Sequence, residues 1–235
     1  MVGKLVQSNW KQINEIIAES AKRAGRSKNQ VRVVGVAKKQ TADRVKAALE
    51  AGLEIIGENY AQEFTARKKQ FPSQQIDWHF VGHLQSNKVN VVVGQVELIH
   101  SVDRISLANK LGQVAEKRKT IQNILMEINI DAELSKSGVL IEDALQLLES
   151  IQKIQGIRLC GLMAMPSLKK SADESRICFA RIRQLSEKWK SYVSPGSVGH
   201  HLGEISMGTT SDFSFAVEEG ATLVRLGTSL FGPRE

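Results

Sequence analysis

The sequence predicts an α/β protein built as a (β/α)8 barrel, and three observations support that fold class. Eight short apolar segments, each typical of a buried strand, recur at intervals of about 20 to 36 residues. Every segment but the last is followed by a stretch with the composition of a helix. The first strand is not followed by the glycine-rich phosphate loop that an open doubly wound sheet, the alternative, would place there. Eight strand–helix units in about 200 residues are typical of a closed barrel.

The first predicted strand, residues 31–37, is a nearly continuous apolar run of the kind found in parallel strands covered on both faces. Lys38 follows it directly, and an amphipathic stretch over 45–49 indicates a helix beyond. Lys38 is therefore expected at the carboxyl edge of the sheet, where α/β folds place their chemistry. An amine held among apolar groups loses its proton more easily and can form a Schiff base with an aldehyde. The alternative is that Lys38 and Lys39 are two solvated loop lysines.

The remaining elements follow in the same alternation. A helix over 4–24 precedes the repeating pattern. The further predicted strands cover residues 53–56, 76–82, 96–103, 121–130, 157–166, 205–208 and 221–227. The further predicted helices cover residues 60–70, a segment capped by Ser86, and residues 105–117, 139–154, 174–190 and 211–220. No stretch is long or polar enough to be a linker, so we expect one domain over residues 1–235 with an additional N-terminal helix.

Composition excludes several classes of function. The net charge is +7, but the basic residues are scattered and do not alternate with aromatic residues, so we expect no nucleic-acid binding. The two cysteines, Cys160 and Cys178, lack metal-ligand spacing and are expected to be small buried apolar groups. The sequence contains neither a signal peptide nor a membrane span, so we expect a cytoplasmic protein. A monomer is the expected state.

Two glycine- and hydroxyl-rich loops indicate a phosphate site. SMGTTSD (206–212) follows the seventh predicted strand, and RLGTS (225–229) lies at the end of the eighth. Barrels frequently bind phosphate at these two adjacent loops, where backbone N–H groups and hydroxyls can donate to it. Ordinary helix capping is the alternative. Because strand one adjoins strand eight in a barrel, Lys38 would face this site, which suits a phosphorylated aldehyde such as pyridoxal 5'-phosphate or a sugar phosphate.

Eight motifs in one order resemble a known family. They are AKKQT (37–41), GENY (57–60), WHFVGHLQSNK (78–88), HSVD (100–103), INIDAELSKSG (128–138), GLMAM (161–165), SMGTTSD (206–212) and VRLGTSLFG (224–232). Together they are similar to the YggS/PROSC pyridoxal phosphate homeostasis proteins. The resemblance implies a barrel like the N-terminal domain of alanine racemase that binds pyridoxal phosphate without a well-established reaction.

The resemblance also implies roles for particular residues. Lys38 would form the Schiff base, Asn59 would lie near the phenolic oxygen of the cofactor, and Arg225 would face its pyridine nitrogen. Lys136 matches a lysine near the mouth that assists cofactor exchange. The residues that would hold the phosphate are Ser206, Gly227 and Thr228, with the backbone of Met207 and with Thr210.

Arg225 can also be interpreted from its own chemistry. A guanidinium stays protonated and can only donate a hydrogen bond, which keeps the ring nitrogen unprotonated and makes the cofactor a poorer electron sink. This favours holding the cofactor over turning over amino acids. The alternative is a structural arginine paired with a carboxylate such as Glu204 or Glu127.

Some positions depart from the family pattern. The family commonly has Ser before the lysine and a Lys-Pro pair shortly after it, where this sequence has Ala37 and the pair Gln40-Thr41. Thr209 and Thr210 stand where Met and Ser are usual. The adjacent His200 and His201 have poor spacing for two ligands of one metal, so we interpret them as loop residues and expect no metal site.

Three functions remain for comparison. The first is a pyridoxal phosphate carrier or homeostasis protein without substrate turnover, which contacts pyridoxal-phosphate-dependent apo-enzymes only transiently. The second is an amino-acid racemase or decarboxylase that acts through Lys38. A two-base racemase of this fold takes its second proton donor from an additional β-domain, and the sequence ends at Glu235, just past the eighth strand. The third, a Schiff-base aldolase, usually carries its lysine on a later strand. The first function is the one we expect.

Overall fold

The barrel predicted from the sequence is confirmed by a computed structural model that describes residues 2–72, 74–133, 135–167, 170–196 and 198–233. Eight parallel strands close in chain order, and β8 pairs with β1. The strands are β1 (Arg32–Val36), β2 (Ile55–Glu58), β3 (Asp77–Phe80), β4 (Leu98–Val102), β5 (Gln122–Ile128), β6 (Ile157–Ala164), β7 (Glu204–Ser206) and β8 (Leu223–Leu226). That the whole chain, residues 1–235, acts as one domain stays a prediction.

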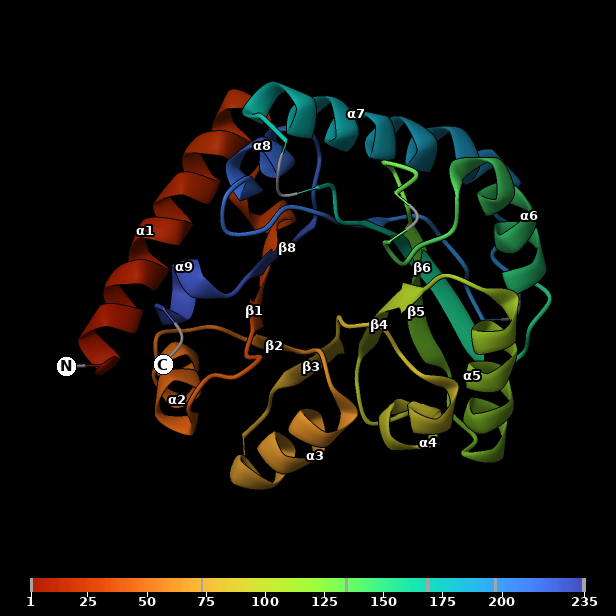
Figure 1. Cartoon of the computed structure of the whole chain (residues 1–235), viewed down its shortest axis with the longest axis horizontal. Coiled ribbons are helices and arrows are strands. Elements are labelled where there is room, and N and C mark those ends of the chain that lie inside the picture. Colours follow the sequence, from red (N-terminus) through yellow and green to blue (C-terminus); the bar gives the residue numbers. More distant parts are fainter. Residues whose placement is uncertain (1, 73, 134, 168–169, 197, 234–235) are drawn as a thin grey trace.

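Helices surround the strands (Figure 1). They are α1 (Val2–Arg23), α2 (Ala42–Glu50), α3 (Ala61–Gln70), α4 (Val89–Val92), α5 (Ile105–Lys117), α6 (Ile141–Ile151), α7 (Ala172–Trp189), α8 (Phe213–Glu218) and α9 (Thr228–Phe231). Short 3-10 helices are η1 (Lys28–Gln30), η2 (Ser86–Lys88) and η3 (Lys190–Tyr192).

Several elements differ from the sequence prediction, and three of them show why. The second strand lies two residues later than predicted, because Gly57 and Glu58 continue the pairing with β3 instead of ending it. Ser86 caps no helix: it is the first residue of η2, preceded by Gln85, and η2 leads into the single turn of α4. The short helix α9 after β8 was not predicted, since its four residues carry no helical periodicity.

Two apolar regions stabilise the barrel. The larger one lies between the sheet and the helices and includes Phe64, Phe179 and Phe231. The smaller one draws its members from six strands and none from a helix, so it faces the lumen; it contains Val34, Ile55, Leu98, Leu125, Cys160, Met163 and Leu223. Both cysteines are free and buried.

Helix α1 lies outside the repeating pattern, along α2, α8 and α9 (Figure 1). Its buried residues Val6, Ile13 and Ile17 face these helices, and Asn9 Nδ2 donates to Leu230 O at 3.1 Å. The helix therefore covers the side of the barrel where the last strand meets the first.

Candidate functional site

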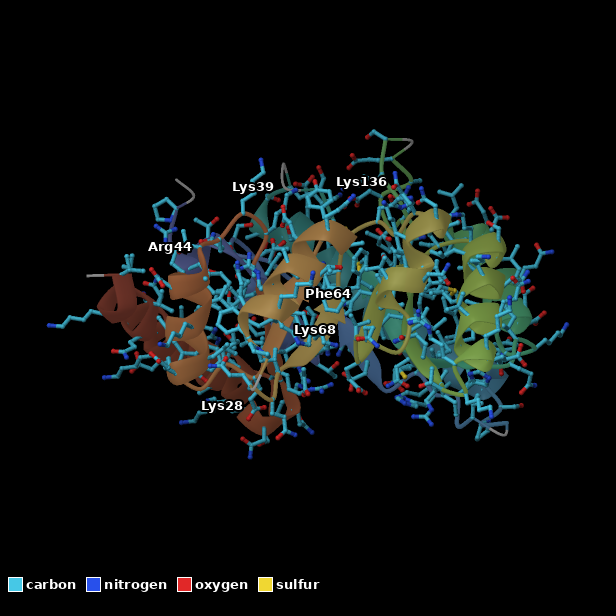
Figure 2. All side chains as sticks on the ribbon, turned by 90° about the horizontal axis from the view of Figure 1, so that it is seen from below. Lys28, Lys39, Arg44, Phe64, Lys68 and Lys136 are labelled. Atoms are coloured by element: carbon cyan, nitrogen blue, oxygen red, sulfur yellow. The ribbon has the colours of Figure 1, made fainter. Side chains whose placement is uncertain are left out.

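A cavity of about 730 Å³ opens at the carboxyl ends of the strands. In the side view, Lys39 and Lys136 mark this upper edge, while Lys28, which precedes β1, lies at the opposite edge (Figure 2). Seven of the predicted site residues line the cavity: Lys38, Asn59, Lys136, Thr210, Arg225, Gly227 and Thr228. The structure therefore brings together, in one cavity, residues spread over almost two hundred positions of the chain.

A buried arginine donates hydrogen bonds to the backbone of the loop that carries Lys38. Arg67 of α3 donates from Nη2 to Ala37 O and to Gln40 O, each at 3.0 Å, and from Nε to Glu58 Oε1. Glu58 is fully buried, and burial raises its pKa to about 7 although Arg67 opposes the shift. The arginine thus fixes the backbone on both sides of Lys38.

Gln40, one of the departures from the family pattern, takes part in the same support. Its side-chain Oε1 accepts from Arg44 Nη1 at 3.2 Å, and Arg44 Nη1 also donates to Pro233 O at 2.5 Å. Thr41 accepts from the backbone N–H of Arg44 and so caps α2. The departures therefore connect the Lys38 loop to α2 and to residue 233.

Lys38 Nζ lies 4.9 Å from the centre of the Tyr60 ring, a cation–π distance. Beside it, Asn59 lines the cavity, and its Oδ1 is buried without a hydrogen-bond partner. The end of β3 approaches closely here, because a Cβ on Gly82 would lie 2.3 Å from Asn59 O. The unpartnered amide group is available to a polar ligand.

The two predicted phosphate loops lie next to each other at the cavity wall. Thr210 Oγ1 is 3.2 Å from Ser229 Oγ, and Asp212 Oδ1 accepts from the backbone N–H of Thr209 at 2.6 Å. In the described part of the chain, no group accepts a hydrogen bond from the backbone N–H of any of four loop residues: Thr210, Ser211, Gly227 and Thr228. These loops therefore offer open donors together with hydroxyls.

Arg225 reaches the cavity from the lumen. Its Nη1 donates to Ser206 Oγ at 2.6 Å and its Nη2 to Ala164 O at 3.0 Å. Burial lowers its pKa to about 10, so it remains a cation at neutral pH. Glu204 pairs with Arg32 at 2.6 Å, and among the described residues no ion pair joins Arg225 to Glu204 or to Glu127, so the alternative of a structural ion pair is wrong.

Two residues expected to contact phosphate do not line the cavity. The hydroxyl of Ser206 is fully buried in the lumen, where it forms hydrogen bonds with Arg225 and His100. The reason is the alternation of side chains along β7. The backbone N–H of Met207, expected to donate to phosphate, donates instead to Leu223 O at 3.1 Å. We therefore correct the expected phosphate-binding roles of the Ser206 hydroxyl and the Met207 backbone.

Glu127 is a cavity residue that the sequence analysis considered only as a partner of Arg225. Burial and the nearby Asp103 carboxylate raise its pKa to about 7, while Arg225 opposes that shift. The signal in the sequence was a single acidic residue within the apolar strand 121–130. A buried carboxyl poised near neutrality supplies a second polar group beside the guanidinium.

Lys136 is held at the mouth by acidic neighbours. Its Nζ lies 3.1 Å from Asp131 Oδ2 and 3.1 Å from Glu133 Oε1. Asp131 also contacts Lys170 Nζ at 3.2 Å and accepts from Ser167 N at 2.7 Å. Asp131 thus joins the loop after β5 to the loop after β6.

The two adjacent histidines have different surroundings. His200 is buried, and its Nδ1 accepts from the backbone N–H of Leu159 at 3.1 Å, whereas His201 is exposed. In the described residues, no group of three or more His, Cys, Asp or Glu is arranged to hold a metal ion. Among the described helices, none has the length and apolar character needed to cross a bilayer.

Comparison with known proteins places the chain in a family. Residues 5–235 match the model of the alanine racemase N-terminal domain. The pyridoxal phosphate homeostasis protein of Aquifex aeolicus is 35% identical over 221 residues, which cover 94% of this chain and 95% of the relative. The protein of the same name from Pseudomonas aeruginosa is 34% identical over 98% of this chain and 96% of its own length.

A solved structure agrees. PipY of Synechococcus elongatus with pyridoxal phosphate bound superposes with a TM-score of 0.80 at 31% identity, covering 92% of this chain and 100% of PipY. The chain therefore belongs to the alanine racemase N-terminal domain family, and within it to the pyridoxal phosphate homeostasis proteins. D-threonine aldolase from Filomicrobium marinum, 14% identical with a TM-score of 0.75, shares the fold.

Proposed function

We propose that the cavity binds pyridoxal 5'-phosphate and that the protein takes part in the homeostasis of this cofactor. One observation carries the proposal: Lys38 and the open N–H donors of the two phosphate loops line the same cavity. An amine and a phosphate site in one cavity match the two ends of a phosphorylated aldehyde. The family to which the chain belongs supports the choice of pyridoxal phosphate among such aldehydes.

The residues present fit this cofactor. Asn59 Oδ1 is a buried polar atom without a partner at the cavity wall. Gly208 has φ +87°, and a Cβ there would lie 2.4 Å from Ala216 Cβ, so the loop adopts a turn that only glycine allows. The turn at Gly208 and the open backbone donors together provide a cradle for an anion, while Asn59 offers an acceptor to another part of the ligand.

Each residue has a proposed role. Lys38 holds the cofactor covalently, Arg225 donates to its ring nitrogen, and Asn59 lies at its phenolic oxygen. Thr210, Gly227 and Thr228 donate to its phosphate. When bound, pyridoxal phosphate would supply an aldehyde carbon to which the Lys38 amine could bond, with the aldehyde oxygen leaving as one water.

We further propose that the protein holds the cofactor without turning over a substrate. Arg225 is buried and keeps its protons, so it can only donate to the ring nitrogen. That nitrogen then stays unprotonated, which disfavours carbanion chemistry. Lys136, at the mouth, is proposed to assist exchange. A cytoplasmic location, a monomeric state and transient contact with apo-enzymes stay predictions.

The proposal is tested by trapping. The purified protein is incubated with pyridoxal phosphate and reduced with borohydride, and the label is mapped by peptide mass spectrometry. We expect one cofactor per chain, attached to Lys38. Lys38→Ala should lose the label, while Lys39→Ala, the adjacent exposed lysine, should keep it.

A second measurement distinguishes a protein that only binds the cofactor from one that uses it to convert a substrate. The loaded protein is mixed with L-alanine, and formation of D-alanine is followed over many hours. We expect no inversion above that of free cofactor. Inversion that Lys38→Ala abolishes would favour the racemase alternative, and labelling spread over many lysines would contradict a built site.

A further inference from the structure

A line of polar side chains crosses the lumen of the barrel beneath the cavity. It begins at His79 on β3, passes through His100 on β4 and Ser206 on β7, and ends at Arg225 on β8. His79 Nδ1 lies 2.9 Å from His100 Nε2, and His100 Nδ1 lies 2.9 Å from Ser206 Oγ. Arg225 Nη1 donates to Ser206 Oγ at 2.6 Å. Four strands therefore contribute one continuous row of hydrogen bonds.

Only one end of this row reaches the cavity. His79, His100 and Ser206 are each at most 1% exposed and do not line the cavity, whereas Arg225 does. Three buried polar groups are costly unless each finds a partner. All three are linked to the Arg225 guanidinium, either by a direct hydrogen bond or through one another.

The protonation states of these groups determine which atom donates and which accepts in each hydrogen bond of the row. Burial and neighbouring arginines lower the pKa of both imidazoles, that of His79 to about 3, so each is neutral and carries one N–H. Ser206 Oγ accepts from Arg225, and among the described residues His100 Nδ1 is the acceptor that its own hydrogen can reach, so we assign Ser206 as donor to His100. His100 then carries its hydrogen on Nε2 and donates it to His79 Nδ1. Every hydrogen bond in the row points away from Arg225.

We propose that His79, His100 and Ser206 are positioning residues that hold the Arg225 guanidinium at the ring nitrogen of the cofactor. This inference rests on the proposed function. The row gives Ser206 Oγ a fixed orientation with its lone pair toward Arg225, and Ala164 O holds a second nitrogen of the same group. A guanidinium held at two points keeps its remaining donors fixed relative to the cavity.

The first test needs no cofactor. The chain has five histidines, so long-range ¹H–¹⁵N spectra of the histidine-labelled protein can be assigned by single variants. We expect His79 and His100 to be neutral, with the hydrogen on Nε2, at pH 6 to 8. Ser206→Ala should shift the His100 resonances and leave those of His83 and His201 in place. A protonated imidazole, or hydrogens on Nδ1, would overturn the proposed direction.

The second test uses bound cofactor. Ser206→Ala and His100→Leu should weaken pyridoxal phosphate binding by about three- to ten-fold, as expected for losing one ordinary hydrogen bond, and should shift the visible absorption band of the bound cofactor. His100→Asn, which keeps a polar atom near Ser206, should restore most of the affinity. The matched control is His200→Leu, also a buried histidine, which should reduce stability without moving the band.

The outcomes separate this inference from the proposed function. If the unmodified protein traps no cofactor at Lys38, the proposed function fails. If it traps cofactor normally but Ser206→Ala and His100→Leu behave like His200→Leu, the positioning role alone is wrong.

Discussion

At the scale of single residues, the buried pair Glu58–Arg67 gives the sharpest expectation. Removing one partner of a buried ion pair leaves an uncompensated charge, so Arg67→Ala should lower the free energy of unfolding by about 3–5 kcal/mol. The double variant Glu58→Leu with Arg67→Met replaces both charges by apolar groups and should recover most of that loss. Urea unfolding measures both.

The same double variant separates stability from positioning. Ala37 O and Gln40 O lose their donors in it, so covalent labelling of Lys38 should stay slower than in the unmodified protein even where stability recovers. Labelling that recovers together with stability would contradict the positioning role of Arg67. Lys69→Ala, an exposed change on the same helix, is the control.

The buried histidine His79 predicts a pH dependence of stability. Its pKa is lowered to about 3 in the folded protein, whereas the unfolded chain takes up the proton near 6.5. Stability from this group is therefore complete above pH 6.5 and is lost as the pH falls toward 3. The fall in unfolding free energy from pH 7 to pH 5 should be smaller in His79→Gln by about 1–2 kcal/mol.

The buried glutamates do not obscure this comparison. The pKa values of Glu58 and Glu127 are raised to about 7, so their effect runs the other way and stability from them falls as the pH rises through 7. Their contribution is common to both proteins and cancels in the difference. His201→Gln, an exposed change, should leave the pH dependence unaltered. An equal slope in His79→Gln and the unmodified protein would contradict a neutral buried His79.

Sequence reasoning found seven residues that line the cavity and missed most of the residues that support them from behind. Lys38 and Arg225 stand out because a charge next to an apolar run needs an explanation. Arg67 and His100 carry no such signal, since their partners Gln40 and Ser206 are 27 and 106 positions away in sequence. Contacts at these separations depend on the closed barrel, which periodicity predicts only in outline.

At the scale of elements, the turn before α8 gives a prediction. Gly208→Ala would place a Cβ 2.4 Å from Ala216 Cβ in a backbone with φ +87°, so the phosphate loop must move. We expect at least a ten-fold loss of pyridoxal phosphate affinity, measured by equilibrium binding. Gly25→Ala is the matched control: φ is +67° but no atom lies within 4 Å, so only a stability cost of about 1 kcal/mol should appear.

Element prediction succeeded where periodicity was long and failed where elements were short. The boundaries of α5 agree with the sequence at both ends, because thirteen residues carry a full amphipathic pattern. The four-residue helices α4 and α9 hold too few residues to show any period. Since α9 begins at Thr228, the missed helix is also the one that positions part of the phosphate loop.

At the scale of the whole molecule, α1 stabilises the junction between the last strand and the first. Ile17 is 1% exposed within this interface, so Ile17→Ala should lower the free energy of unfolding by about 2–5 kcal/mol. Leu5→Ala, on the same helix but 46% exposed, should cost less than about 1 kcal/mol. Equal losses in the two variants would contradict the packing of α1 on the barrel.

A protein that passes on its cargo must also release it, and the ring of Tyr60 bears on how long the cargo stays. In the protein without a bound ligand, Lys38 Nζ lies 4.9 Å from the centre of that ring. A cation–π contact of about 0.5–1 kcal/mol would favour the unlinked lysine by about two- to five-fold. If Lys38 holds the cofactor as proposed, Tyr60 would shift the balance between linked and unlinked lysine without touching the ligand.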